Sequence, residues 1–520
     1  MVETVDLIES LVGKHVAEDG ADRIAYIDSD MGEVTYRQLY CAAGAFAARL
    51  AEQGVVSGSR CIVVADDSAA AVAAIVGLWW RGCIPVPVSP QLTEKEIIFI
   101  VEDSGAVFAY LDVLSARRVG LARLLSEIEQ CDSTLVREDL AKAPAVLRVD
   151  RVPTRARWAS SQEALLQYTS GSTGTAKGVR HSAAAMMDVS AGFGRILALG
   201  PADTLLSTAK LSFGYGFGNS VLLPLAAGAC TVLLRGGIDA YVVTRAIRVH
   251  RPTVLCSVPR IYASLPGTFG AGEITDHCLR LAVTAGEHCP AELVESTRRL
   301  LGVPLINGLG ATEALHIVVA TSDHSEPGTT GFAVPGTVAT VRGDDGKVLA
   351  EDTVGRLHIA GPTVAAGYLN RPEAERRTFA DGGVYTGDIA RVSSAGSVGY
   401  VARADDMMNL GGHKVAPGEI ESAIQGVAGV ADCAVVGGLN ADGLDEAIAY
   451  VVSDGESPAA VRHAVLAAMR ADLAPFKRPG RVEMVESLPT TSTGKLARYR
   501  LRTMGHIDSE RFDVVRHPTT

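Results

Sequence analysis

The first hundred residues alternate between segments with helical and with extended patterns of apolar residues. Tyr36–Gln53 has the pattern of an amphipathic helix, and the short apolar run Cys61–Ala65 predicts a buried strand. The same reasoning predicts a helix over Ala69–Arg81 and a strand over Ile84–Val88, which ends before a proline. Strands that alternate with helices are typical of a mostly parallel sheet with helices packed on its faces.

Three more short apolar runs predict further strands of this kind. They are Val254–Val258, Leu281–Ala285 and Val303–Ile306, and each ends near Gly, Ser or Pro. In folds of this class, ligands bind where strands end, on loops held by a rigid scaffold. The residues that follow these runs are therefore candidates for a functional site.

The sequence changes in character near residue 345. Gly355–Ala360 and Gly399–Ala402 predict short strands joined by turns rich in Gly and Asp, and a charged turn, Arg403–Asp406, precedes the last 115 or so residues. That final stretch predicts, in order, helix Pro417–Gln425, strand Cys433–Gly437, strand Glu446–Val452, helix Ala459–Leu473 and strand Arg481–Val485. We expect an α/β protein with a large N-terminal domain of layered sheets and a small β-rich subdomain, residues 1–404, followed by a small α+β domain, residues 405–520.

Composition excludes several classes of protein. Of the 520 residues, 48% are hydrophobic and 21% are charged, which is a globular balance, and the net charge of −11 argues against binding of nucleic acid. The nine cysteines form no C-x-x-C pair, so neither a zinc site nor a disulfide framework is expected. The most apolar stretch, Ala69–Trp80, is shorter than the roughly 20 residues that span a bilayer, and the N-terminus lacks the features of a secretory signal. We expect a cytoplasmic protein that does not bind membranes.

The strongest local signal is the stretch Tyr168–Gly178, with sequence YTSGSTGTAKG. Glycines let backbone N–H groups approach a phosphate, and hydroxyl groups with Lys177 add further donors. The spacing of a Walker loop fails, because Gly178 follows the lysine. The alternative is a flexible surface linker, but the buried strand predicted at Leu165–Tyr168 favours a phosphate-binding loop.

Three weaker signals add charged groups. Lys495 follows a Gly turn and is a movable point charge. Glu313 offers a carboxylate suited to Mg²⁺, or, alternatively, it forms with Thr312 the first turn of a helix. Asp388 ends a turn and could accept hydrogen bonds from ribose hydroxyls, although alone it would be taken for an ordinary turn aspartate.

Together, the order, residues and spacing of these motifs resemble the adenylate-forming superfamily of acyl-CoA synthetases, peptide-synthetase adenylation domains and luciferases, from about Thr35 to Arg502. The resemblance implies that ATP or AMP is bound by Thr169, Ser170, Gly171, Ser172, Thr173, Gly174, Ala285, Gly286, Glu287, Asn307, Gly308, Asp388 and Arg403. It implies that the catalytic residues are Lys177 over the β- and γ-phosphates, Thr312 at the α-phosphate, Glu313 on Mg²⁺, and Lys495 between the α-phosphate and the substrate carboxylate. It also implies that the small domain is mobile and rotates about Asp405, with Gly411 and Gly412 along a thiol tunnel.

Within that superfamily the sequence is most similar to benzoate-CoA ligases. The similarity is carried by Leu211–Asn219, Leu223–Gly228, His250–Thr253, Val258–Ala263, Thr284–Glu287 and Glu313–Ile317. It implies an acyl pocket lined by Phe213, Gly214, Tyr215, Gly310 and His316. Those ligases usually have Ala where this chain has Gly214, which suggests more room and a substituted or larger acid. Asn409 stands where a Lys is common, so the family pattern supports the identity of the thiol acceptor less than it supports the adenylation step.

The expected function is an acid–thiol ligase that uses ATP and Mg²⁺ to convert an aromatic carboxylate into its adenylate and then transfers the acyl group to coenzyme A. Three alternatives stay open: an aryl-AMP ligase that loads a carrier protein, an acyl-CoA synthetase for a larger non-aromatic acid, and a nucleotide-binding regulatory module without catalysis. The sequence also leaves open whether the chain forms a homodimer.

Overall fold

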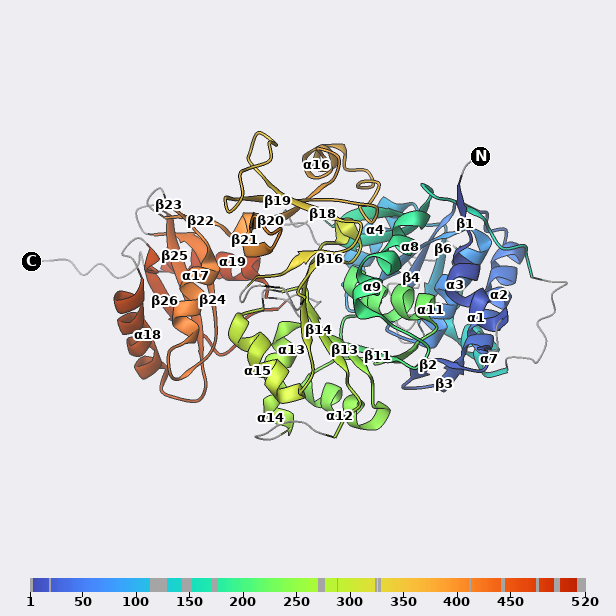
Figure 1. Cartoon of the computed structure of the whole chain (residues 1–520), viewed down its shortest axis with the longest axis horizontal. Coiled ribbons are helices and arrows are strands. Elements are labelled where there is room, and N and C mark those ends of the chain that lie inside the picture. The colour runs from blue at the N-terminus through green and yellow to red at the C-terminus, as the bar shows by residue number, and fades with distance from the viewer. Residues whose placement is uncertain are drawn as a thin grey trace, which may run out of the picture. The chain divides into compact units, whose positions relative to one another are not determined.

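The structure is a computed structural model of the chain (Figure 1). It describes residues 3–17, 20–112, 129–142, 152–169, 176–269, 276–287, 289–322, 325, 329–410, 413–440, 445–473, 477–490 and 496–511. The chain divides into two compact units. The large unit comprises Met1–Thr340, His358–Thr386 and Val392–Gly399, and the small unit comprises Val341–Leu357, Gly387–Arg391 and Tyr400–Thr520. The domain boundary between residues 404 and 405 stays a prediction.

A nine-stranded sheet forms the centre of the large unit. Its strands are β2 (Ile24–Asp28), β3 (Gly32–Thr35), β11 (Thr204–Ser207), β12 (Cys230–Leu233), β13 (Val254–Ser257), β14 (Leu281–Ala285), β15 (Leu305–Gly310), β16 (Ile317–Ala320) and β17 (Phe332–Ala333). The order across the sheet is β17-β16-β15-β14-β13-β11-β12-β2-β3. The six central strands, β15 to β2, pair in parallel, whereas β3, β16 and β17 are antiparallel to their neighbours.

Helices and helical turns fill the connections of the large unit. They are η1 (Glu9–Gly13), α1 (Lys14–Ala17), α2 (Tyr36–Glu52), α3 (Ala69–Arg81), α4 (Glu94–Ser104), α7 (Ser133–Lys142), α8 (Ala183–Ala191), α9 (Phe193–Leu197), α10 (Gly214–Phe217), η4 (Gly218–Leu222), α11 (Leu223–Ala227), α12 (Ala240–His250), α13 (Pro259–Ser264), α14 (Pro266–Phe269), α15 (Ala291–Leu301), η5 (Thr312–Ala314) and α16 (Pro372–Thr378). Among the described residues, none of these helices combines the length and the apolar character that crossing a membrane requires.

Side-chain alternation along the central strands creates two cores. Leu205 belongs to the core that includes residues of α2 and α3, whereas its neighbour Leu206 belongs to a second core with residues of α12, α13 and α15. Leu255 and Ala282 face the second core, as successive strand residues point to opposite faces. Helices therefore cover both faces of the sheet, and α12 to α15 gather beside β11, β13 and β14 (Figure 1).

A second, parallel sheet lies N-terminal to the predicted phosphate loop. Its strands are β4 (Arg60–Val64), β5 (Ile84–Val88), β6 (Phe108–Leu111) and β7 (Glu129–Asp132), in the order β5-β4-β6-β7. The two-stranded pairs are β1 (Thr4–Val5) with β8 (Trp158–Ala159) and β9 (Glu163–Thr169) with β10 (Lys177–Ser182).

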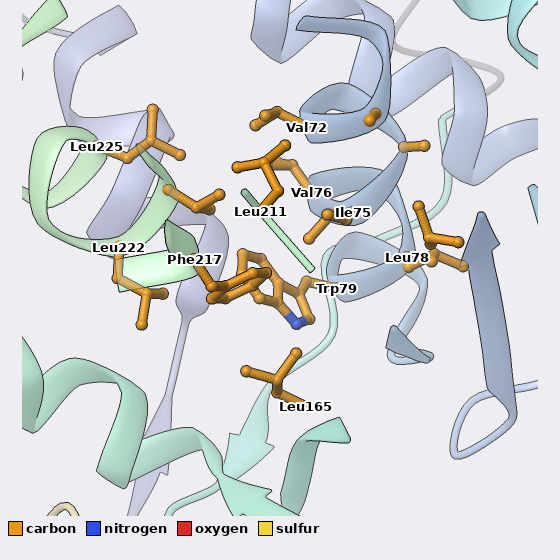
Figure 2. Packing of buried hydrophobic residues seen from close by; sticks show 14 of the residues in the cluster. Val72, Ile75, Val76, Leu78, Trp79, Leu165, Leu211, Phe217, Leu222 and Leu225 are labelled. Atoms are coloured by element: carbon orange, nitrogen blue, oxygen red, sulfur yellow. The ribbon is translucent and has the colours of Figure 1, made fainter. Parts of the chain in front are cut away.

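Helix α3 is buried along its whole length except at its last residue. The Ser68 side chain caps its N-terminus by accepting a hydrogen bond from the Ala71 amide at 3.2 Å, and Gly82, with φ +82°, ends it. Figure 2 shows its apolar side chains packed against Leu165 of β9 and Phe217 of α10. The Trp79 ring meets Phe217 edge-on at 6.0 Å and donates a hydrogen bond from Nε1 to the Ala164 carbonyl at 2.8 Å. Helix α3 thus ties β9 to the segment that carries the predicted acyl pocket.

A four-stranded sheet has the order β18-β19-β20-β21 and is crossed by the division between the two units. Its strands are β18 (Val338–Arg342), β19 (Val354–Ala360), β20 (Val384–Val392) and β21 (Val398–Arg403). The remaining elements of the small unit are η6 (Ala404–Asp406), β22 (Met408–Leu410), β23 (His413–Val415), α17 (Pro417–Gln425), β24 (Val430–Leu439), β25 (Asp445–Ser453), α18 (Pro458–Asp472), β26 (Arg481–Met484) and α19 (Arg498–Arg511).

The small unit is built around the sheet β24-β25-β26. On β24, Val435 faces a core shared with α17 and α18, and the next residue, Val436, faces a second core with Leu501 of α19. The α/β class and the small α+β element order predicted from the sequence are confirmed. The predicted bounds of α3, β5, β14 and α17 agree with the structure to the residue.

Candidate functional site

The predicted phosphate loop connects two paired strands. Thr169, the last residue of β9, lies opposite Lys177, the first residue of β10. The sheet therefore brings the two ends of the motif together. The loop residues Ser170, Gly171, Ser172, Thr173 and Gly174 lie outside the described residues, as do Gly411, Gly412 and Lys495.

Residues 365–369 form a further backbone neighbour of β10. The Leu369 amide donates to the Gly178 carbonyl at 2.7 Å, and the Arg180 amide donates to the Gly367 carbonyl at 3.0 Å. These bonds place Tyr368 against β10, where it pairs with Val179 and is 5% exposed. The contact joins positions almost 190 residues apart in the sequence.

Tyr368 contacts two predicted catalytic groups at once. Its hydroxyl donates a hydrogen bond to Glu313 Oε1 at 2.5 Å, and Lys177 Nζ lies 5.2 Å from the centroid of its ring. The Glu313 carbonyl also accepts a hydrogen bond from the Ala365 amide at 2.8 Å. Sequence reasoning did not find Tyr368, because nothing in its neighbourhood signals a contact with either residue. Lys177 and Glu313 are thus brought to one place, as the resemblance required.

Glu313 belongs to a short helical turn that ends in a strained residue. Thr312 and Glu313 lie in η5, and Leu315 has φ +66° and ψ −43°. The His316 amide donates to the Ala314 carbonyl at 2.8 Å, which makes Leu315 the centre of a γ-turn of the rare positive-φ kind. Such strain persists only where the surroundings fix it, and it is common at functional sites. The turn separates Glu313 from His316.

His316 is buried and stays neutral at physiological pH. Burial lowers the pKa of His316 to about 4. Its Nε2 lies 3.2 Å from Asn219 Oδ1, and its ring centroid lies 5.6 Å from that of Tyr215 and 5.3 Å from that of Phe193. Two predicted pocket residues, Tyr215 and His316, therefore lie side by side. A neutral imidazole is suited to an aromatic wall and not to offsetting a carboxylate charge.

Gly214 does not leave the space that the sequence suggested. A Cβ added to Gly214 would lie 2.7 Å from the Leu315 carbonyl oxygen and 3.3 Å from Gln167 Oε1. The backbone of the strained turn already fills that side, so the extra room expected from the missing methyl is absent. Phe213, half-buried, comes directly before α10, and Gly310 lies against the His316 backbone.

Five of the residues predicted to bind ATP or AMP lie at the carboxyl ends of two neighbouring parallel strands. Ala285 of β14 pairs with Gly308 of β15, and Asn307 pairs with the residue before Ala285. Gly286 and Glu287 continue from β14, and Glu287 Oε1 lies 3.7 Å from Arg260 Nε. This edge of the sheet is where the fold class binds ligands.

The sequence placed the end of β15 wrongly. A strand over Val303–Ile306 was expected, but β15 runs from Leu305 to Gly310 and pairs with β16. A Cβ on Gly308 would lie 2.6 Å from the Ile317 side chain. These glycines therefore serve close packing of two strands, and not a turn.

The predicted ribose-binding residues pair with each other in the small unit. Arg403 Nη1, at the end of β21, lies 2.9 Å from Oδ1 of Asp388 on β20. Asp405 lies in η6 and is exposed, and its carbonyl accepts a hydrogen bond from Arg502 Nη2 at 3.0 Å. Thr490 and Leu496 form an antiparallel bridge in the small unit.

Metal binding by protein side chains alone has no candidate here: among the described residues, no group of three or more His, Cys, Asp and Glu side chains could hold a metal ion. Glu313 nevertheless suits Mg²⁺ shared with ATP, because within the described part of the chain only one of its carboxylate oxygens accepts a hydrogen bond. A hollow of about 630 Å³ is lined by residues including Asp30, Gln38 and Arg235, and by none of the predicted site residues.

A family model for AMP-binding enzymes matches residues 13–369, and a model for the C-terminal domain of AMP-binding enzymes matches residues 419–495. The chain belongs to the AMP-binding enzyme family. It is 33% identical to a 4-hydroxybenzoate–CoA/benzoate–CoA ligase of Rhodopseudomonas palustris over 510 residues, which cover 96% of this chain and 94% of the relative.

Solved structures of the same family have the same fold. A benzoate CoA ligase from Burkholderia xenovorans LB400 superposes with a TM-score of 0.87 at 29% identity, covering 96% of this chain and all of that one. An anthranilate CoA ligase determined with anthranoyl-AMP superposes with a TM-score of 0.86 at 27% identity, covering 98% of each chain.

Proposed function

We propose that this enzyme activates an aromatic carboxylate with ATP and transfers the acyl group to coenzyme A. The observation that carries the proposal is the cluster of Lys177, Tyr368 and Glu313 at the end of the phosphate-loop motif, in the same unit as the aromatic pair Tyr215 and His316. The similarity to benzoate- and hydroxybenzoate-CoA ligases supports the aromatic acid as substrate.

In the first step, a carboxylate oxygen forms a bond to the α-phosphorus of ATP, and the bond from that phosphorus to the oxygen bridging to the β-phosphate breaks. Pyrophosphate leaves and an acyl-AMP results. Two anions must meet, so positive charge is required at the phosphates. Lys177 and the donors of the phosphate loop would supply it for the leaving group, and Thr312 and Lys495 would act at the α-phosphate. Mg²⁺ held by Glu313 would neutralise further phosphate charge.

In the second step, the sulfur of coenzyme A forms a bond to the acyl carbon, the bond from that carbon to the AMP oxygen breaks, AMP leaves, and the thiol proton passes to water. Lys495 must leave before the thiol can enter. A rotation of the small domain about Asp405 would achieve this, with Gly411 and Gly412 along the thiol path. Asp388 and Arg403 would hold the ribose.

Three finer points belong to the same proposal. The acceptor is free coenzyme A and not a carrier protein, the enzyme acts in the cytoplasm, and the boundary of the mobile domain is at residues 404–405. Eight cysteines within the described part of the chain are free thiols, which is in keeping with a reducing compartment.

Release of pyrophosphate that depends on the added acid tests the adenylation step. The panel should contain benzoate, hydroxy- and aminobenzoates, cinnamates and medium-chain acids, with Lys495→Ala as control. We expect a preference for one benzoate-like acid and loss of the signal in the variant. A preference for the medium-chain acids would favour the alternative of a larger non-aromatic substrate, and adenylate without thioester would favour a carrier-protein acceptor.

A further inference from the structure

Gln167 is buried in the large unit without a hydrogen-bond partner. It lies on β9, is 1% exposed, and neither its Oε1 nor its Nε2 makes a hydrogen bond within the described part of the chain. A buried side-chain amide almost always has partners, since leaving its donor and acceptor unpaired is costly. The two free groups therefore point to a partner that is not part of the protein.

The position of Gln167 relates it to both halves of the candidate site. It pairs with Val179, whereas Thr169, two residues on, pairs with Lys177. Because side chains alternate along a strand, Gln167 lies on the same face of the hairpin as Thr169 and Lys177. The amide is thus on the face that also carries the ends of the phosphate loop.

The carboxamide also lies where the two pocket segments meet. Gln167 Oε1 is 3.3 Å from the place that a Cβ on Gly214 would take, and the Leu315 carbonyl is 2.7 Å from the same place. Gly214 precedes Tyr215, and Leu315 precedes His316, so the amide is next to the backbone that presents the two pocket rings. A ring-bearing acid held by these rings would bring its substituents towards Gln167.

The neighbouring polar side chains of the pocket each have at least one protein partner. His316 Nε2 lies 3.2 Å from Asn219 Oδ1, and the Tyr215 hydroxyl lies 3.4 Å from the carbonyls of Ser257 and Val283. His316 Nδ1 and Asn219 Nδ2 also lack a hydrogen bond among the described residues, but only one polar atom of each side chain is unpaired, whereas Gln167 uses neither its acceptor nor its two donors. This combination matches a group that both donates and accepts.

We propose that Gln167 determines specificity by hydrogen-bonding a hydroxyl or amino substituent on the ring of the aromatic acid. The inference rests on the proposed function and names the class of acid within it. An unsubstituted ring would leave the amide buried and unpaired in the complex, and sites of this kind discriminate against the substrate that lacks the polar group.

The test compares kcat/KM for thioester formation from benzoate with that from 2-, 3- and 4-hydroxybenzoate and 2-aminobenzoate. It uses the full-length wild type and the variant Gln167→Met, which keeps an unbranched side chain of similar length without the amide. We expect the wild type to favour at least one substituted acid over benzoate by about tenfold or more, and the variant to lose that preference. The ratio of two acids within one variant does not depend on the fraction of folded enzyme.

Gln162→Leu is the matched control, because Gln162 precedes β9 and its amide oxygen has a protein partner, the Ala159 amide at 3.2 Å. It should leave the ratio unchanged. An unchanged ratio in Gln167→Met would overturn the proposal. Equal kcat/KM of the wild type for benzoate and for each substituted acid would also overturn it, and this result does not depend on the folding of any variant. A wild type inactive with every aromatic acid would instead overturn the proposed function, and this inference with it.

Discussion

Tyr368 connects the two charged residues to which we assign roles at the phosphates. Its hydroxyl donates a hydrogen bond to Glu313 Oε1, the carboxylate that we propose to hold Mg²⁺, and Lys177 Nζ lies 5.2 Å from the centroid of its ring. A residue that orients a metal ligand affects metal binding without touching the metal itself. Tyr368 is therefore expected to act as a positioning residue for Glu313.

Replacing Tyr368 with Phe removes the hydroxyl and keeps the ring. We expect the Mg²⁺ concentration for half-maximal pyrophosphate release to rise about tenfold, because the Glu313 carboxylate is no longer held. Titration of activity with Mg²⁺ at fixed ATP measures this shift. Tyr385→Phe is the control, since it removes a hydrogen bond of the same length, 2.5 Å, to the Asp381 carboxylate. Equal Mg²⁺ dependence in Tyr368→Phe and wild type would contradict the assigned role.

A methyl group at position 214 tests whether the strained turn matters. In Gly214→Ala the Cβ would meet the Leu315 carbonyl at 2.7 Å, so the turn between Glu313 and His316 must shift. We expect kcat/KM for the acid to fall at least about tenfold, as misplacement of a site by an ångström does. Gly200→Ala adds the same methyl where nothing lies within 4 Å, and it should have no effect. Full activity in Gly214→Ala would contradict the prediction, because it would show that the turn can shift without loss of activity.

At the scale of elements, the sequence predicted the bounds of helices and strands correctly where residues at their ends, such as a capping Ser or a terminating Gly, mark them. Ser68 and Gly82 bound α3, and short apolar runs mark the strands β5 and β14. The end of β15 was missed because Gly308 and Gly310 signal a turn, whereas the structure uses them for close contact with β16. This close contact depends on residues of β16, such as Ile317, which cannot be recognised from the sequence of β15 alone.

The connection between β4 and α3 holds the segment in front of α10. Asp67 Oδ1 accepts a hydrogen bond from the Leu211 amide at 2.9 Å, and Asp66 Oδ1 lies 2.8 Å from Lys210 Nζ. Burial raises the pKa of Asp67 to about 7, with Lys210 and the Leu211 amide opposing the rise. The folded protein thus holds a proton there that the unfolded chain, with an ordinary pKa of 3.8, releases.

This linkage predicts a pH-dependent stability. The contribution of Asp67 is fully present below about pH 4 and is lost as pH rises towards 7, because the unfolded state binds fewer protons over that range. Asp67→Asn keeps an acceptor for the Leu211 amide and cannot ionise. We therefore expect the thermal midpoint of the variant, relative to wild type, to increase steadily between pH 4 and 7. A difference between the two midpoints that does not vary with pH would contradict the prediction.

At the scale of the whole molecule, the motifs predicted the class of enzyme, and the family match bears this out. The tertiary contacts that assemble the site could not be predicted from the sequence. Tyr368 is brought to β10 by backbone pairing with Val179 across almost 190 residues, and Gln167 Oε1 lies 3.3 Å from the place that a Cβ on Gly214 would take. Such pairings depend on tertiary packing, which neither periodicity nor motif spacing encodes.

The hinge prediction also belongs to this scale. Asp405→Pro fixes φ at the residue about which the small domain is proposed to rotate. We expect pyrophosphate release to stay within about threefold of wild type, and thioester formation to fall at least about tenfold, since the second step needs the rotation. Measuring both half-reactions on one preparation makes each the control for the other. A parallel loss of both would contradict a hinge at Asp405.

The most direct test of the central claim is a product balance for one complete reaction. ATP, Mg²⁺, coenzyme A and a hydroxybenzoate are incubated with the enzyme, and AMP, pyrophosphate and the acyl thioester are quantified together. An acid–thiol ligase of this mechanism yields the three products in equal amounts, and Glu313→Gln, which lacks the carboxylate, yields little of any. Formation of ADP and phosphate, or no consumption of ATP with any aromatic acid, would contradict the account.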